Sequence, residues 1–198
     1  MKALWKKEWI AYGRTYIPII ALVILAYLVL SASMGMFVDA LVPMVILIVP
    51  PLLSVYLDAE NGWHDHACLC YRRRDVVRVK YITAMACALF AALITGTLAR
   101  NWQIGAEAGA CTAAISSVFL FLSLRSPSSR TWTMACAVLA GFTGILVLQP
   151  IAAQVIRQQY KYYGIDIEIV LPDPLLWIVL PLVIALAAWI AAENLDAH

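Results

Sequence analysis

The chain has 198 residues, of which 64% are hydrophobic and only 13% are charged, with a formal net charge of +2. A soluble domain carries about 25% charged residues, so this composition excludes a chain that folds in water and indicates one that folds in a lipid bilayer. Six membrane helices of about 20 residues use about 120 residues. The remaining loops are too short for a nucleotide-binding, Rossmann or kinase domain.

The first 15 residues are basic and aromatic. Lys2, Lys6, Lys7 and Arg14 outnumber the one acid, Glu8. The aromatic residues are Trp5, Trp9, Tyr12 and Tyr16. Because they follow one another at three or four positions, a helix places them on one face, at the level of the lipid headgroups. We therefore expect an interfacial helix over residues 1–15.

Six apolar stretches of the length of a bilayer crossing follow. They cover residues 16–34, 38–57, 80–99, 106–124, 131–149 and 175–192. The fold class predicted is an all-α integral membrane protein, with a single transmembrane domain over residues 1–198 and six transmembrane helices. Pro50 and Pro51 are expected to kink the second span, because each removes a backbone donor.

The distribution of basic residues predicts the orientation. Eleven of the 14 Lys and Arg residues fall on one side, in 1–14, 72–80 and 125–130; Arg100, Arg157 and Lys161 fall on the other. Lys and Arg are enriched in cytoplasmic loops. Both termini are therefore expected in the cytoplasm, with residues 58–80 in a cytoplasmic segment and residues 150–174 in an extracytoplasmic segment.

Acidic residues within the apolar stretches are few. Asp39, Asp58 and Glu107 all stand near span ends, so we interpret them as anchors that reach the headgroups. Ion-coupled transport, which uses ligands at the midplane, is disfavoured accordingly. Gly105 and Gly109 form a G-x-x-x-G pattern that permits close helix packing, and we expect this packing within the chain rather than in a dimer.

The densest polar segment runs from Asp58 to Lys80. Asp75 is placed to cap a helix that continues into the third span. The segment also contains four imidazole and thiol side chains, those of His64, His66, Cys68 and Cys70. These groups bind zinc and copper, but their alternating spacing suits one metal only in an extended loop. A metal site, a solvated loop and a partner contact all remain open.

No catalytic constellation is present in the sequence. The chain has neither the G-x-S-x-G pattern of a serine nucleophile nor the Walker A pattern G-x-x-x-x-G-K-[ST]. We expect no enzyme activity and no cofactor in this chain, so work driven by ATP requires a separate subunit.

Three strings resemble small permeases of the ABC-2 transporter family: Glu60-Asn-Gly-Trp63, Arg72-Arg-Arg-Asp75-Val-Val and Lys80-Tyr81-Ile82. Leu4-Trp-Lys-Lys-Glu8 is similar to that family's opening. Where the family commonly has Leu-Pro before the basic cluster, this chain has Leu69-Cys70-Tyr71.

The resemblance implies the membrane subunit of a bacterial ABC exporter in the cytoplasmic membrane. Two copies, as a homodimer or a related heterodimer, would work with two separate ATPase subunits that bind ATP and Mg. No nucleic acid partner is expected. The loop between spans two and three would form a coupling helix against the ATPase, with contacts from Asp58, Glu60, Gly62, Trp63, Arg72, Arg73, Arg74 and Asp75. The few fixed charges suit an amphipathic or lipophilic cargo, such as a peptide, a lipid or a drug-like molecule.

Two other functions remain open from the sequence. One is a membrane scaffold that assembles with other subunits and transports nothing. The other is a metal-handling membrane protein that uses His64, His66, Cys68 and Cys70.

Overall fold

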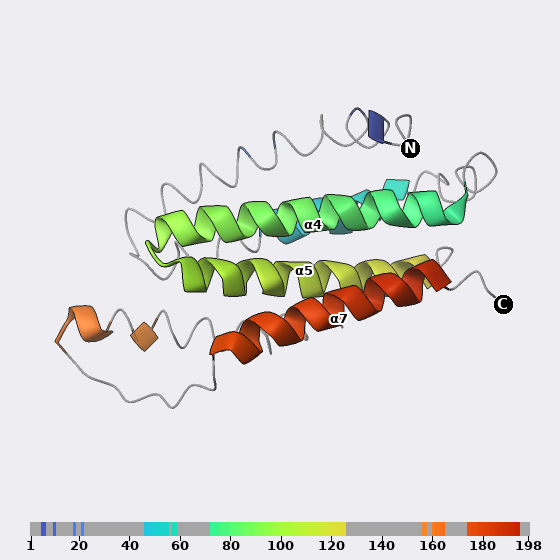
Figure 1. Ribbon diagram of the computed structural model, residues 1–198. Coiled ribbons are helices and arrows are strands. Elements are labelled where there is room, and N and C mark those ends of the chain that lie inside the picture. Colours follow the sequence, from blue (N-terminus) through green and yellow to red (C-terminus); the bar gives the residue numbers. More distant parts are fainter. Residues whose placement is uncertain are drawn as a thin grey trace.

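The fold consists of helices that lie side by side (Figure 1). The computed structural model describes Trp5, Lys6, Ile10, Pro18, Ala21 and residues 46–55, 57–58, 72–125, 156–157, 160–164 and 174–194. The three long helices are α4 (Arg73–Leu98), α5 (Trp102–Arg125) and α7 (Pro174–Asn194). Over the described residues the chain contains no strand, in agreement with the predicted all-α class.

Three of the predicted spans correspond to these helices. Each is long and apolar enough to cross a membrane, over Arg74–Leu98, Trp102–Leu124 and Leu175–Asn194. Part of the predicted second span forms the shorter apolar helix Ile46–Val55, in which Pro50 and Pro51 are helical and buried. The predicted first span lies almost wholly outside the described residues, and the predicted fifth span lies wholly outside them. Of the predicted interfacial helix, Trp5, Lys6 and Ile10 are helical.

Helix α4 begins earlier than the sequence suggested. Its N-cap is Arg72, whose backbone is extended, and the backbone N–H of Asp75 donates to the Arg72 carbonyl oxygen at 2.8 Å. The prediction that Asp75 is the cap was wrong, because the helical hydrogen bonding already includes it. Asp75 lies in the first turn instead, where a carboxylate favours the positive end of the helix dipole.

A tight turn joins α4 to α5. The Ala99 N–H donates to the Thr95 carbonyl oxygen at 2.9 Å and closes α4. Arg100 follows with a φ of 50°, and the side-chain oxygen of Asn101 accepts a hydrogen bond from the Gln103 N–H at 3.0 Å, in the manner of a helix N-cap. The two helices therefore run antiparallel.

Helix α5 is the central helix of the described bundle. Of its apolar stretch 83% is buried, against 33% for α4 and 17% for α7. It packs against both of them, whereas α4 and α7 touch each other little. The exposed surfaces of α4 and α7 are therefore the ones available to lipid or to another chain.

The close approach of α4 and α5 depends on glycine. A Cβ added at Gly105 would lie 2.5 Å from the Ala92 carbonyl oxygen and 2.7 Å from Gly96 Cα. One added at Gly109 would lie 2.7 Å from the Ala92 Cβ. The G-x-x-x-G pattern thus serves packing within the chain, as predicted.

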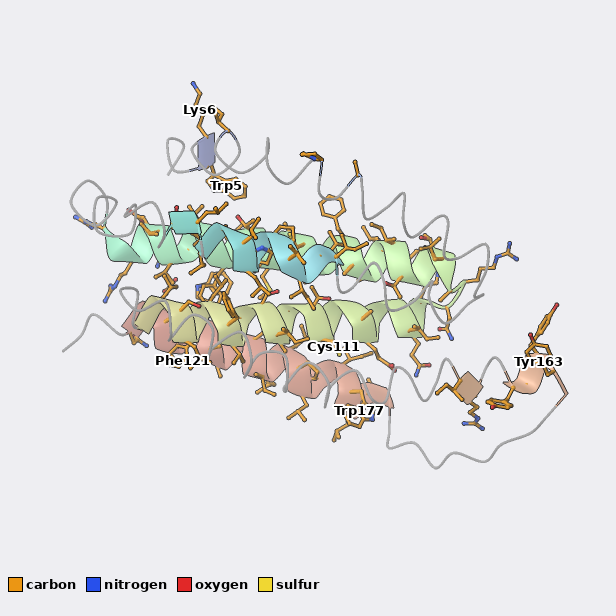
Figure 2. All side chains as sticks on the ribbon, turned by 180° about the vertical axis from the view of Figure 1, so that it is seen from behind. Trp5, Lys6, Cys111, Phe121, Tyr163 and Trp177 are labelled. Carbon is orange, nitrogen blue, oxygen red and sulfur yellow. The ribbon has the colours of Figure 1, made fainter. Side chains whose placement is uncertain are left out.

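The bundle has two chemically different ends. Arg72, Arg74 and Arg78 lie at the start of α4, and α5 and α7 end at the same end of the bundle. We call this end the basic end. The helical turn at 160–164, which belongs to the predicted extracytoplasmic segment, lies at the opposite end (Figure 1). Figure 2 shows Trp5 and Lys6 toward the same end as Phe121, and Tyr163 and Trp177 toward the other.

Candidate functional site

The basic end contains the residues that flank the predicted coupling loop. Asp58 closes the described part of the second span, and Arg72 precedes α4. Arg72 and Arg74 are exposed, and Asp75 is half-buried. Glu60, Gly62 and Trp63 lie outside the described residues, as do the metal candidates His64, His66, Cys68 and Cys70. The structure describes Arg73 as the first residue of α4.

A buried ion pair joins the two segments that flank this loop. The Lys80 ammonium lies 2.6 Å from Asp58 Oδ2, and their side chains are only 4% and 7% exposed. Lys80 Nζ also donates a hydrogen bond to Ser54 Oγ at 2.7 Å. Ser54 and Asp58 are one helical turn apart, so they present their oxygens on one face. Asp58 is therefore a buried partner of Lys80, and the prediction that it reaches the headgroups was wrong.

Tyr81 connects α4 to the other two long helices. Its hydroxyl lies within hydrogen-bonding distance of two backbone carbonyl oxygens, that of Ser117 on α5 at 3.0 Å and that of Ala188 on α7 at 3.1 Å. Its ring stacks on Trp189, with the ring centroids 5.6 Å apart and the planes at 14°. The residue is fully buried. One side chain thus bridges three helices at the basic end.

An exposed ion pair lies beside Tyr81. Arg78 Nε donates to Glu193 Oε1 at 2.9 Å, and the Trp189 indole N–H donates to the same oxygen at 3.0 Å. The Arg78 side chain is 45% exposed. Because water screens such a pair, it adds little stability. It is a contact between α4 and α7 at the basic end.

Glu107 is the acidic residue of the opposite half of α5. It is fully buried, and its Oε1 accepts a hydrogen bond from Gln103 Nε2 at 3.2 Å. The prediction that Glu107 anchors at the headgroups was therefore wrong. The fold covers this side chain completely, which position along the chain does not reveal.

An apolar groove lies in the half of the bundle away from the basic end. Its volume is about 420 Å³, and it is bounded by Met85 and Leu89 of α4, Gly109 and Ala113 of α5, and Ile178 and Leu182 of α7. Helices α4 and α7 meet at Tyr81 and Trp189. Farther along, small residues of α5 form part of the groove lining. The groove offers a surface for hydrocarbon and no charge.

Sequence reasoning missed Ser54, Lys80, Trp189 and Glu193 as parts of the site. Lys80 was counted only as one of the basic residues that set the orientation. Charge complementarity could have indicated the pair. Asp58 directly follows the second predicted span and Lys80 begins the third, so both fall at the same membrane face.

Taken together, long apolar helices, a buried ion pair and a basic end define an integral membrane protein. A family model described as "ABC-2 family transporter protein" matches residues 3–192. The chain therefore belongs to the ABC-2 transporter family, as the resemblance of the short strings predicted. The comparisons with curated proteins and with solved structures gave no match.

Proposed function

We propose that this chain is the permease subunit of an ABC exporter of the ABC-2 type. The observation that carries the proposal is the family match over nearly the whole chain. The geometry of the basic end supports it, because both flanks of the 59–71 loop are attached to the helix bundle there. A displacement of that loop would therefore act on the helices directly.

The energy would come from a separate ATPase subunit. The sequence has no Walker A pattern, so ATP and Mg would bind in the partner and this chain would catalyse nothing. Two ATPase copies and a second permease copy, identical or related, would complete the transporter. The little-buried faces of α4 and α7 offer surface for the second copy and for lipid.

The coupling segment would be residues 58–75. Closure of the ATPase subunits on ATP would push on it and tilt the spans, which would open a path to the outside of a bacterial cytoplasmic membrane. The excess of Lys and Arg supports a cytoplasmic location for this segment and for both termini. Arg72 and Arg74 are exposed and can reach acidic groups of a partner or lipid headgroups.

The substrate would be amphipathic or lipophilic, such as a peptide, a lipid or a drug-like molecule. The apolar groove between α4 and α7 supports this class, because it can hold a hydrocarbon group and offers nothing to balance a charge. An ion or a sugar would find no polar partner among its lining residues.

Affinity purification from the native membrane tests the proposal. The tagged chain is isolated in mild detergent, and stoichiometric partners are identified by mass spectrometry. We expect an ATPase with Walker motifs. A well-folded chain that co-purifies with no ATPase in several detergents would contradict the proposal and favour the scaffold function.

The arginine cluster gives a more specific prediction. We expect that replacing Arg72, Arg73 and Arg74 with alanine lowers the affinity for the ATPase by about tenfold, because a single ion pair at a surface contributes little and the variant removes three positive charges together. The measurement is titration of the detergent-purified chain with the purified ATPase.

A matched control removes three exposed basic residues at the opposite end: Arg100, Arg157 and Lys161. This variant changes the net charge equally and should bind like the wild type. Equal weakening by both triple variants would show a general charge effect and remove the cluster from the coupling role.

A further inference from the structure

The buried ion pair of Asp58 and Lys80 lies where the proposed mechanism needs a mechanical connection. The two residues flank the loop 59–71, and α4 begins between that loop and Lys80. Their side chains are 7% and 4% exposed, and Ser54 supplies a third polar group 2.7 Å from the ammonium. The contact therefore fixes the spacing of the two segments that carry the loop.

Stability alone does not account for this pair. Removing two charges from water costs about as much as their attraction returns, so an apolar pair of similar volume is commonly as stable or more stable. An ion pair differs because its two charges attract each other strongly in a medium of low dielectric. When the partners separate there, each charge loses the attraction that offset the cost of its removal from water. Segments joined in this way resist separation and move together.

The next residue of α4 extends the connection to the rest of the bundle. Successive residues of a helix point about 100° apart, so Lys80 faces the second span while Tyr81 faces α5 and α7. Tyr81 lies within hydrogen-bonding distance of the carbonyl oxygens of Ser117 and Ala188. A movement of the loop flanks would thus reach all three long helices through two adjacent side chains.

We infer that Asp58 and Lys80, with Ser54, are positioning residues that hold the second span and α4 together, so that a displacement of the segment between them moves both as one unit. The inference rests on the proposed function and extends it by naming the contact that carries the motion. Without the pair, the second span and α4 would separate under load, and less of the displacement would reach α5 and α7.

The experiment measures movement of the helices instead of transport, so it needs no substrate. Spin labels are attached at two exposed positions, Leu93→Cys on α4 and Val183→Cys on α7, in a background in which the five native cysteines are alanine. Electron–electron resonance then compares the label-to-label distance in the purified complex with the ATPase, without nucleotide and with ATP and vanadate.

Four variants are compared with the parent complex. Asp58→Asn and Lys80→Gln each break the ion pair. Asp58→Leu combined with Lys80→Met replaces the pair with apolar contacts that preserve folding. Lys161→Gln is the matched control, because it makes the same change as Lys80→Gln at an exposed position at the opposite end of the bundle.

We expect the label-to-label distance to change with ATP and vanadate in the parent complex and in the Lys161→Gln complex. In the three variants that break or replace the Asp58–Lys80 pair, the ATPase is still bound. In these variants, the ratio of complexes with the changed label-to-label distance to complexes with the unchanged distance should fall by roughly tenfold or more. The apolar double variant is decisive, since a merely structural role would leave its distance change intact.

The possible failures are distinct. If the folded apolar double variant keeps the full distance change, the transmitting role of the pair is overturned and the proposed function stands. If no ATPase binds the parent chain, the proposed function fails, and the transmitting role fails with it.

Discussion

Gly105→Val is expected to prevent the close packing of α4 and α5 and to lower the stability of the chain strongly. The new Cβ would lie 2.5 Å from the Ala92 carbonyl oxygen and 2.7 Å from Gly96 Cα. Both neighbours are backbone atoms, which cannot rotate aside, so the helices must separate. Overpacking of a core costs about 1–3 kcal/mol and occasionally more, and we expect about 3 kcal/mol or more here.

The measurement is thermal unfolding of the detergent-purified chain, followed by size-exclusion chromatography after heating. Ala187→Val is the control, because it also places valine on a long helix but at an exposed position of α7. Its midpoint should stay near that of the wild type. An unchanged midpoint for Gly105→Val would contradict the close α4–α5 contact.

Tyr81→Ala is expected to destabilise the basic end by about 3–5 kcal/mol, the range for large aromatic side chains replaced by alanine in a core. The substitution removes the ring that stacks on Trp189 and the hydroxyl that bridges α5 and α7. Tyr81→Phe keeps the ring and should cost only about 1–2 kcal/mol, the value of a lost buried hydrogen bond.

Unfolding by denaturant measures both effects, and near-ultraviolet circular dichroism reports changes in aromatic packing, to which Trp189 contributes together with the other six tryptophans. Tyr163→Ala serves as the control, since this tyrosine is 69% exposed and should change stability by no more than about 0.5 kcal/mol. If Tyr81→Ala were as stable as Tyr163→Ala, the bridging role of Tyr81 would be refuted. Equal losses for Phe and Ala would assign the whole effect to the hydroxyl.

These two substitutions test different parts of the same arrangement. Gly105 sets how closely α4 and α5 approach in the half away from the basic end, and Tyr81 holds all three long helices together at the basic end. Between them, α4 and α7 diverge and leave the apolar groove.

The sequence by itself determined that the chain belongs to a membrane protein family, the ABC-2 transporters, and that α4, α5 and α7 are long and apolar enough to cross a membrane. It could do so because hydrophobicity is a local property: about 20 consecutive apolar residues indicate a bilayer crossing whatever lies beside them. The packing role of Gly105 and Gly109 was also predicted, since small residues at this spacing permit close approach.

The tertiary structure alone decided which side chains meet. Asp58 and Glu107 looked alike in the sequence, as single acids near span ends, yet one pairs with Lys80 and the other lies against Gln103. Tyr81 is 36 positions from Ser117 and 107 from Ala188. Such contacts depend on the rotation and crossing of whole helices, and these are set by the combined packing of three helix faces instead of by any single stretch of sequence.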